Sequence, residues 1–262
     1  MKSFISWATV LFALFICFSC SKEVEISDSK YLSKYGYLMI QSIEIVRESG
    51  NQPWITFSYN GNEQLVQAVR NDDVFTFDYD EDNRLLQIIK ENPALGTSIK
   101  VDSFVYDQSD RIIAKYGYSH VSDPAEQSVL WQKEAYEYDA QGRITAQVLT
   151  FLDNDVYERV TEYDWKDNNF KSSHLITTGD TWYRAAYKFD NRVNYRLHHP
   201  YFLMEDVVQT ENNVTQINYS DLDPLLDLAC DKCEFEYKFN SGGAVIEETL
   251  FNGVQQFIIN YD

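Results

Sequence analysis

The feature that most constrains this chain is a short hairpin pattern that returns along almost its whole length. The clearest copy runs from Tyr136 to Ile144. Tyr136 and Tyr138 are two residues apart, so in an extended strand they share one face while the acidic residues take the other. Asp139 and Gly142 then supply turn chemistry, because Asp bonds its own backbone and Gly accepts positive φ. The pattern predicts a half-buried strand, a tight turn and a return strand.

Two further copies are nearly intact, at residues 77–85 and 104–112. Asn83 and Asp110 stand where the clearest copy has Gly142, and Asn and Asp are the other residues that best tolerate the left-handed conformation. In all three copies an Asp and the Arg four residues later should face one another across the turn. Exposed pairs of this kind help to fix the register of the two strands and contribute little to the stability of the fold.

Weaker copies keep the alternation of aromatic and polar residues. They stand at 57–61, 162–164, 187–192, 217–220, 237–243 and 259–262. From Tyr59 to Tyr261 this makes nine copies at steps of 20 to 32 residues. A period of that size is typical of an array of supersecondary units. We expect about 16 to 18 antiparallel strands in a single domain over residues 35–262.

The Tyr-Asp-x-x-Gly-Arg core of these copies resembles the tyrosine-aspartate (YD) repeats of Rhs-type and teneurin-like shells. The resemblance covers roughly residues 55–262 and is sharp in three copies. The chain is also similar to uncharacterised surface lipoproteins of Gram-negative bacteria, which carry degenerate repeats of this kind in a porin-like β architecture. The resemblance implies a fold and brings no catalytic residues with it.

The predicted fold class is all-β: a single antiparallel meander of repeated hairpins that closes into a flattened, porin-like barrel. A round barrel of this size has a lumen too wide for side chains to fill, so the aromatic face needs a cover. We expect opposite walls to pack on each other. The alternative is a membrane-inserted barrel with this face towards lipid. The face is rich in tyrosine, however, and pairs such as Leu85-Leu86 put apolar groups on both faces.

The N-terminus predicts a signal peptide of the lipoprotein type over residues 1–19. An apolar run from Phe4 to Phe18 is short for a membrane span and ends at Cys20, which polar residues follow. Cys20 is the expected lipidation site, and residues 20–34 form an acidic tether. The alternatives are an uncleaved anchor and a plain signal peptide. We expect a lipid-anchored protein of the outer membrane that faces the cell surface or the periplasm.

Composition narrows the range of partners. The chain has 41 Asp and Glu against 22 Lys and Arg, a net charge of −19. Such a surface repels nucleic acid and anionic headgroups. We therefore expect contact with the membrane through the lipid alone and no nucleic-acid partner. The expected ligand is a glycan or a protein, and the protein is expected to be a monomer. The 19 Tyr, 16 Phe and 5 Trp predict an aromatic core.

Cys230 and Cys233 form the one C-x-x-C pair after the signal region. In an exported protein a local disulfide is the leading interpretation. A zinc site would need two more ligands, and free thiols are the third possibility. The acidic run at 78–82 imitates a calcium loop, but Asn83 occupies its sixth place and Ile89 its twelfth. We expect no metal and no cofactor.

Binding residues are expected in the long connections opposite the tight turns, because loops on a rigid scaffold concentrate them. The candidates are Tyr118, His120, Trp131, Trp182, His199 and Tyr201. Aromatic rings at a rim could stack on sugars or on a protein, although such residues are more often part of a core.

No hydrolase, metalloprotease, phosphate-binding or dinucleotide-binding motif occurs in the sequence. The first hypothesis is a non-enzymatic lipoprotein that binds a glycan or protein through its loop rim. The second is a structural or envelope-assembly lipoprotein without a small ligand. The third is a glycan hydrolase, although its pair of carboxyl groups cannot be identified from spacing, since 41 carboxylates make some close pairs inevitable.

Overall fold

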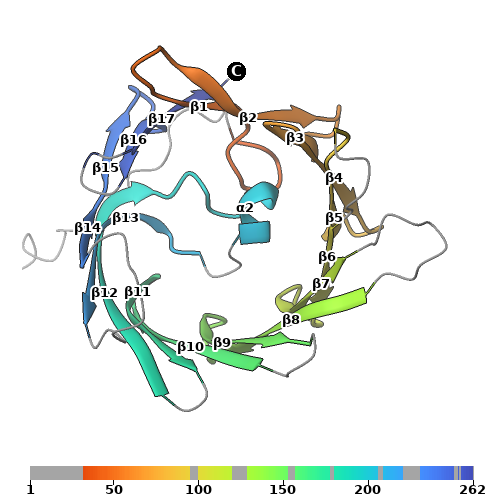
Figure 1. The fold of residues 1–262 in the computed structure, drawn as a ribbon, viewed down its shortest axis with the longest axis vertical. Helices are drawn as coiled ribbons and strands as arrows, with labels where there is room; N and C mark the ends of the chain where they lie inside the picture. The colour runs from red at the N-terminus through yellow and green to blue at the C-terminus, as the bar shows by residue number, and fades with distance from the viewer. Residues whose placement is uncertain are drawn as a thin grey trace, which may run out of the picture.

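A computed structural model shows one antiparallel barrel with a short segment inside it (Figure 1). The structure describes residues 32–94, 100–119, 129–152, 157–177, 180–205, 209–220, 231–250, 253 and 255–261. The predicted signal peptide, Cys20 and most of the tether lie outside these residues. Within them, no helix is long and apolar enough to cross a membrane.

The strands follow one another around the ring in chain order. The first nine are β1 (Ile40–Ile45), β2 (Gln52–Tyr59), β3 (Leu65–Arg70), β4 (Asp73–Tyr79), β5 (Leu85–Glu91), β6 (Lys100–Tyr106), β7 (Ile112–Ser119), β8 (Val129–Tyr138) and β9 (Ile144–Phe151). The others are β10 (Tyr157–Lys166), β11 (Asn169–Thr177), β12 (Asp180–Val193), β13 (Asn212–Ser220), β14 (Lys232–Glu234), β15 (Glu236–Phe239), β16 (Val245–Leu250) and β17 (Gln255–Tyr261). The helix α2 (Pro200–Glu205) stands between β12 and β13.

The ring is closed, because β17 pairs with β1 and β1 pairs with β2. β14 and β15 are separated by Phe235 alone. β14 pairs with β13 on one side, and β15 pairs with β16 on the other. They therefore act as one continuous strand, and the 17 strands of the sheet form one barrel. The all-β, porin-like meander predicted from the repeats is confirmed.

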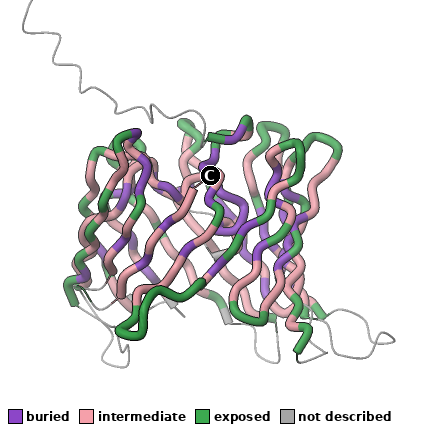
Figure 2. The backbone as a smooth tube through the Cα atoms, turned by 90° about the horizontal axis from the view of Figure 1, so that it is seen from above, coloured by how far each residue is buried: buried purple, intermediate pink, exposed green. Residues whose placement is uncertain are grey.

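Alternation along each strand decides which side chains face the lumen. In β4, Phe75 and Phe77 are buried while Thr76 between them is exposed. In β2, Ile55 and Phe57 are buried in the same way. Figure 2 shows buried positions along the walls and exposed connections at both ends. The aromatic face of the hairpins is thus the inner face of the barrel.

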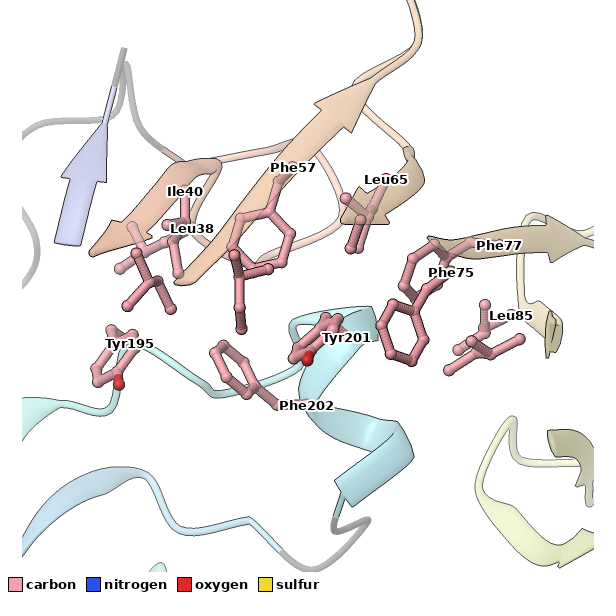
Figure 3. Packing of buried hydrophobic residues seen from close by; sticks show 14 of the residues in the cluster. Leu38, Ile40, Phe57, Leu65, Phe75, Phe77, Leu85, Tyr195, Tyr201 and Phe202 are labelled. Carbon is pink, nitrogen blue, oxygen red and sulfur yellow. The ribbon is translucent and has the colours of Figure 1, made fainter. Parts of the chain in front are cut away.

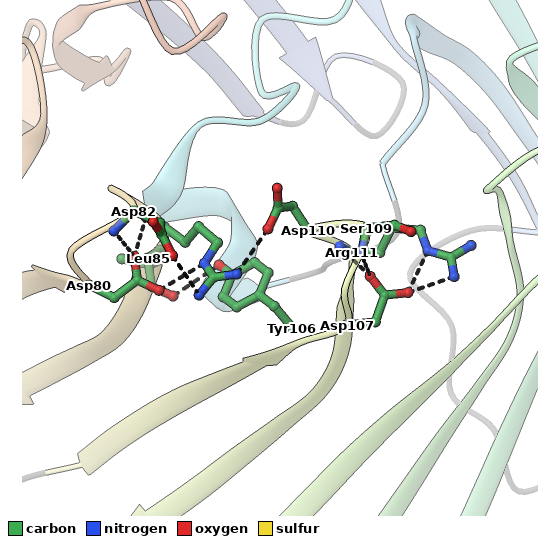
Figure 4. A network of polar contacts seen from close by, with 9 residues as sticks. Asp80, Asp82, Leu85, Tyr106, Asp107, Ser109, Asp110 and Arg111 are labelled. Atoms are coloured by element: carbon green, nitrogen blue, oxygen red, sulfur yellow. Dashed lines mark hydrogen bonds and ion pairs between the residues drawn. The ribbon is translucent and has the colours of Figure 1, made fainter.

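The tight turns are built as the repeat predicts (Figure 4). Asp80 Oδ1 accepts hydrogen bonds from the backbone N–H groups of Asp82 and Arg84, at 3.0 and 2.9 Å. The Arg84 side chain donates Nε–H to Asp80 Oδ2 at 2.8 Å. Asn83 adopts a φ of 65°. The same contacts recur in the turns that begin at Asp107 and Asp139, so the predicted Asp–Arg pairing is confirmed.

Adjacent hairpins are joined by an aromatic side chain that reaches back to the previous hairpin. The Tyr138 hydroxyl donates a hydrogen bond to the carbonyl oxygen of Ile112 at 2.6 Å. Trp165 Nε1–H donates in the same way to Ile144 at 2.6 Å. Because each bond links one hairpin to the next, the repeated aromatic residue holds the array together as well as filling the core.

The connection from β12 to β13 folds into the barrel instead of outward. We call residues 194–205 and 209–211 the inner segment. Tyr201 is 0% exposed, and its ring meets those of Phe57 and Phe75 edge-on, with centroids 5.4 and 5.5 Å apart (Figure 3). The barrel is round in cross-section (Figure 1). The predicted flattening is therefore not what covers the aromatic face, because the inner segment covers it instead.

Candidate binding site inside the barrel

Two lumen-side tryptophans lie where the strand register shifts. Trp131 stands at the irregularity between β7 and β8, and Trp182 at the one between β11 and β12. An extra residue in one strand re-aims its side chain, and such bulges are enriched beside functional sites. Trp131 and Trp182 were both predicted binding residues, and the structure brings them onto the same wall.

These tryptophans belong to a row of aromatic rings and cations, which we call the aromatic row. Lys100 Nζ lies 4.7 Å from the ring centroid of Trp131. The rings of Trp131 and Phe151 are 6.1 Å apart. The guanidinium carbon of Arg159 lies 6.0 Å from the Phe151 ring and 5.9 Å from the Trp182 ring. The row joins side chains from β6, β8, β9, β10 and β12, held in place by the barrel wall.

A glycine makes room beside this row. A Cβ atom on Gly117 would lie 2.7 Å from Cγ of Gln132 and 3.1 Å from Nε1 of Trp131. Real Cβ atoms do not approach side chains that closely. Gly117 therefore lets both side chains lie flat over β7.

A buried carboxylate next to the row is fully engaged. Glu134 Oε1 accepts hydrogen bonds from Lys115 Nζ at 2.8 Å and Gln132 Nε2 at 3.3 Å. Glu134 Oε2 accepts from the Tyr136 hydroxyl at 2.6 Å and Gln147 Nε2 at 2.8 Å. The side chains of Lys115 and Glu134 are only 3% and 6% exposed. Four donors neutralise and hold this carboxylate, which is what a buried charge requires.

Asp102 is a second buried carboxyl group on this wall, and it differs from Glu134. Its residue is 3% exposed, and among the described residues its Oδ1 atom has no hydrogen-bond partner. Burial raises the pKa of the Asp102 carboxyl, while the charges of Lys100 and Lys115 act in the opposite direction. Asp102 therefore takes up a proton more readily than an exposed aspartate.

A cavity of about 320 Å³ opens along the same wall. Its lining includes Gln147, Arg159, Thr161, Tyr163 and Tyr183, and this volume is in the range of small-molecule pockets. Rings, an amide, a hydroxyl group and a guanidinium thus face one space. The Nε atom of Arg159 is buried and has no hydrogen-bond partner among the described residues. The cavity can therefore offer both stacking surfaces and hydrogen-bonding groups to a ligand.

A larger cavity, of about 600 Å³, lies between the inner segment and the tight turns. Its lining includes Arg111 and Arg143. Both guanidinium groups are already paired, with Asp107 at 2.6 Å and Asp139 at 2.7 Å. We take the cavity beside the aromatic row as the candidate site, because the buried Nε atom of Arg159 there has no hydrogen-bond partner among the described residues.

The other predicted binding residues do not join this site. His199 and Tyr201 belong to the inner segment and are both 0% exposed, so their expected place on a loop rim is wrong. They were mistaken for rim residues because an inward connection looks like any other loop in the sequence. Tyr118 lies in β7 opposite Val101, on the outer face of the wall. His120 lies outside the described residues.

The predicted disulfide falls partly outside the described chain. Cys233 of β14 is buried and disulfide-bonded. Its predicted partner, Cys230, lies outside the residues that the structure describes.

Sequence reasoning missed Lys100, Phe151 and Arg159, which the row needs. Arg159 alternates with Thr161 and Tyr163 in β10, so it shares the inner face with them. A charged residue at the same alternating positions of a strand as the aromatic residues shares their face, and this pattern could have predicted an inward-facing cation.

Comparison with known proteins identifies the fold of the chain and nothing further. No protein-family model matches the chain, and no curated protein sequence is similar to it. A porin-like protein from Bacteroides uniformis is similar over 87% of this chain and 100% of that one, with 12% identity and a TM-score of 0.51. One from Bacteroides vulgatus is similar over 85% of this chain and 98% of that one, with 9% identity and a TM-score of 0.53. The chain therefore shares the porin-like barrel fold.

A weaker similarity extends to a Photorhabdus luminescens Tc holotoxin pore. It covers 86% of this chain and 12% of that chain, with 14% identity and a TM-score of 0.37. No argument rests on this similarity.

Proposed function

We propose that this protein is a non-catalytic binding protein of the bacterial cell envelope, and that its barrel interior holds a glycan. The observation that carries the proposal is the cavity beside the aromatic row. Its lining combines the rings of Tyr163 and Tyr183 with hydrogen-bonding groups of Gln147 and Thr161. Sugars present both apolar ring faces and hydroxyl groups, so a surface of this mixed kind suits them.

The state of Glu134 supports binding rather than catalysis. A glycosidase needs two carboxyl groups that face the substrate, one as acid and one as base or nucleophile. Glu134 already accepts four hydrogen bonds from its own wall. It is therefore committed to the barrel, and Asp102 is the buried carboxyl group among the described residues that has an oxygen without a hydrogen-bond partner.

The polar outer face of the barrel supports a barrel that stands in water beside the membrane and is not inserted in it. Polar side chains pair across neighbouring strands there, as in the bond from Gln87 Nε2 to Asp78 Oδ2 at 2.7 Å and from Gln256 Nε2 to Glu247 Oε1 at 2.6 Å. A lipid-facing barrel carries an apolar band at these positions. Together with the lipoprotein-type signal sequence, this polarity favours a barrel that is tethered through lipid on Cys20.

The test is a glycan-array screen of the purified full-length protein, followed by calorimetric titration of each hit. The Tyr183→Ala variant removes a cavity ring and should weaken binding about tenfold or more. Its control is Tyr118→Ala, which truncates an aromatic residue on the outer face and should bind normally. Equal binding by both variants would place the glycan elsewhere. If no glycan binds and crosslinking recovers an envelope protein, the protein is a structural lipoprotein instead.

A further inference from the structure

Arg159 is the feature of the candidate site that its own surroundings do not explain. Its guanidinium group lies between the rings of Phe151 and Trp182 and lines the cavity. No carboxylate pairs with it among the described residues, and its Nε atom is buried without a hydrogen-bond partner. A buried donor without a partner destabilises a fold by about 1–3 kcal/mol, so a donor kept in this state needs an explanation.

Four arginines of the described barrel are paired with carboxylates. Arg84 and Arg143 bond the aspartates of their own turns, at 2.8 and 2.7 Å. Arg196, inside the barrel, bonds Glu248 at 2.7 Å. The chain has nearly twice as many acidic as basic side chains, 41 against 22. Acidic side chains are therefore abundant in this chain, yet none of the described ones pairs with Arg159.

The neighbouring charges leave the cavity with a surplus of positive charge. Glu134 is the acidic residue of the lining, and Lys115 already neutralises it at 2.8 Å. Arg159 therefore stands as a charge of the cavity that no described carboxylate compensates. The two flanking rings hold the guanidinium plane in place, so little entropy is lost when it binds an anion.

We propose that the ligand of this site is an acidic sugar, whose carboxylate pairs with Arg159 while its ring lies in the cavity. The inference rests on the proposed function, because it names the class of glycan that the same site takes. A planar carboxylate matches two N–H donors of a guanidinium side by side, and Nε is one donor left unused. The hydroxyl group of Thr161, which lines the same cavity, would then meet a sugar hydroxyl group.

The experiment compares a uronic-acid oligosaccharide with the neutral oligosaccharide of the same linkage and with a sulfated one, by calorimetric titration of the full-length protein. The uronic acid should bind most tightly, and its affinity should fall as the salt concentration rises. Arg159→Gln should weaken uronic-acid binding roughly 10- to 100-fold and should weaken neutral binding by a smaller factor, because a neutral sugar has no carboxylate to pair with the guanidinium. Arg159→Lys, which keeps the charge and loses the paired donors, should weaken it by less.

The control variant is Arg184→Gln, the same substitution at an exposed position of β12. It should bind like the unaltered protein.

Because Arg159 makes no ion pair in the described structure, Arg159→Gln should unfold at an unchanged or higher temperature, which separates lost binding from lost folding. Equal binding of uronic and neutral sugars would overturn the carboxylate inference and leave the proposed function standing. Preference for the sulfated sugar would also overturn it, and failure of every glycan would overturn both.

Discussion

The hydroxyl group of Tyr106 donates a hydrogen bond of 2.9 Å to the carbonyl oxygen of Leu85, one hairpin earlier in the chain. The guanidinium of Arg84 lies 5.2 Å from the centre of the same ring. Burial raises the pKa of Tyr106 to about 12, so the hydroxyl keeps its proton and stays a donor. This bond is one of the links that join neighbouring repeats.

Tyr106→Phe removes this link and keeps the ring. We expect the free energy of unfolding to fall by about 1 kcal/mol, the usual net value of one such bond. Denaturant unfolding followed by tryptophan fluorescence measures the change. Tyr116→Phe is the matched control, because Tyr116 lies on the outer face and its hydroxyl makes no hydrogen bond within the described residues. A change in the control as large as in the Tyr106 variant would contradict the prediction.

Tyr201→Ala should loosen the inner segment. The side chain is fully buried against Phe57 and Phe75, and truncation of a large buried aromatic residue costs about 3–5 kcal/mol. Hydrogen exchange measured by mass spectrometry should rise in residues 194–205 more than in the outer strands. Val105→Ala is the control, since Val105 is 40% exposed and should change stability by less than about 0.5 kcal/mol. Unchanged exchange in the inner segment would show that it is held by other contacts.

His199 should make stability depend on pH. Burial lowers the pKa of His199 to about 3, from an ordinary value of 6.5. Tyr59 already donates its proton to the carbonyl oxygen of Ile40, so His199 Nε2–H donates to Tyr59 and the imidazole is neutral. Between pH 6.5 and about 3 the unfolded chain binds a proton that the folded chain does not. Stability should therefore fall with decreasing pH, by at most about 1.4 kcal/mol per pH unit.

His199→Phe keeps an aromatic ring and removes the titrating group. The difference in unfolding free energy between the variant and the unaltered protein should shift in favour of the variant as pH drops from 7 to 4. Comparing the two proteins cancels the titration of the carboxylates. A pH-independent difference for His199→Phe would mean that the imidazole is not neutral in the fold.

The buried pair of Lys115 and Glu134 should be strongly coupled. Lys115→Met leaves Glu134 charged and buried, which costs about 3–5 kcal/mol. The double variant Lys115→Met/Glu134→Gln removes both charges and should recover a large part of that loss. Thermal and denaturant unfolding of both single variants and the double variant complete the cycle.

The exposed pair of Lys232 and Glu234 provides the control for this cycle. Both side chains are about half exposed, so the same substitutions there should couple by less than about 1 kcal/mol. Equal coupling at the two pairs would show that burial does not strengthen the interaction. The Lys115 bond to the carbonyl oxygen of Met204, at 3.1 Å, also predicts that Lys115→Met raises hydrogen exchange near α2.

Much of the fold was predictable because its rules are local. The spacing of Tyr136 and Tyr138 places both rings on one face, and Asp139 with Gly142 makes the turn that follows. Gly142 adopts a φ of 81° and Asn83 one of 65°, as the turn requires. The repetition of this unit predicted an all-β meander of about 16 to 18 strands, and the sheet has 17. Each of these features depends on residues that are close together in the chain.

The candidate site was predictable only in part. Trp131 and Trp182 were recognised as aromatic candidates, but their meeting through Phe151 and Arg159 depends on register shifts in two pairs of strands. The place of His199 and Tyr201 was predicted wrongly. No local pattern distinguishes a connection that turns into a lumen from one that turns outward, since the decision depends on how much space the closed ring encloses.

The sequence by itself determined the hairpin, its turn chemistry and its repetition, because these follow from alternation, from the conformational tolerance of Asn, Asp and Gly, and from short-range hydrogen bonds. Only the tertiary structure decided that the barrel is round, that the inner segment covers its aromatic face, and that an arginine without a carboxylate partner in the described structure lines a cavity beside two aromatic rings. Those outcomes depend on the closure of β17 onto β1, a pairing between strands more than two hundred residues apart in the chain.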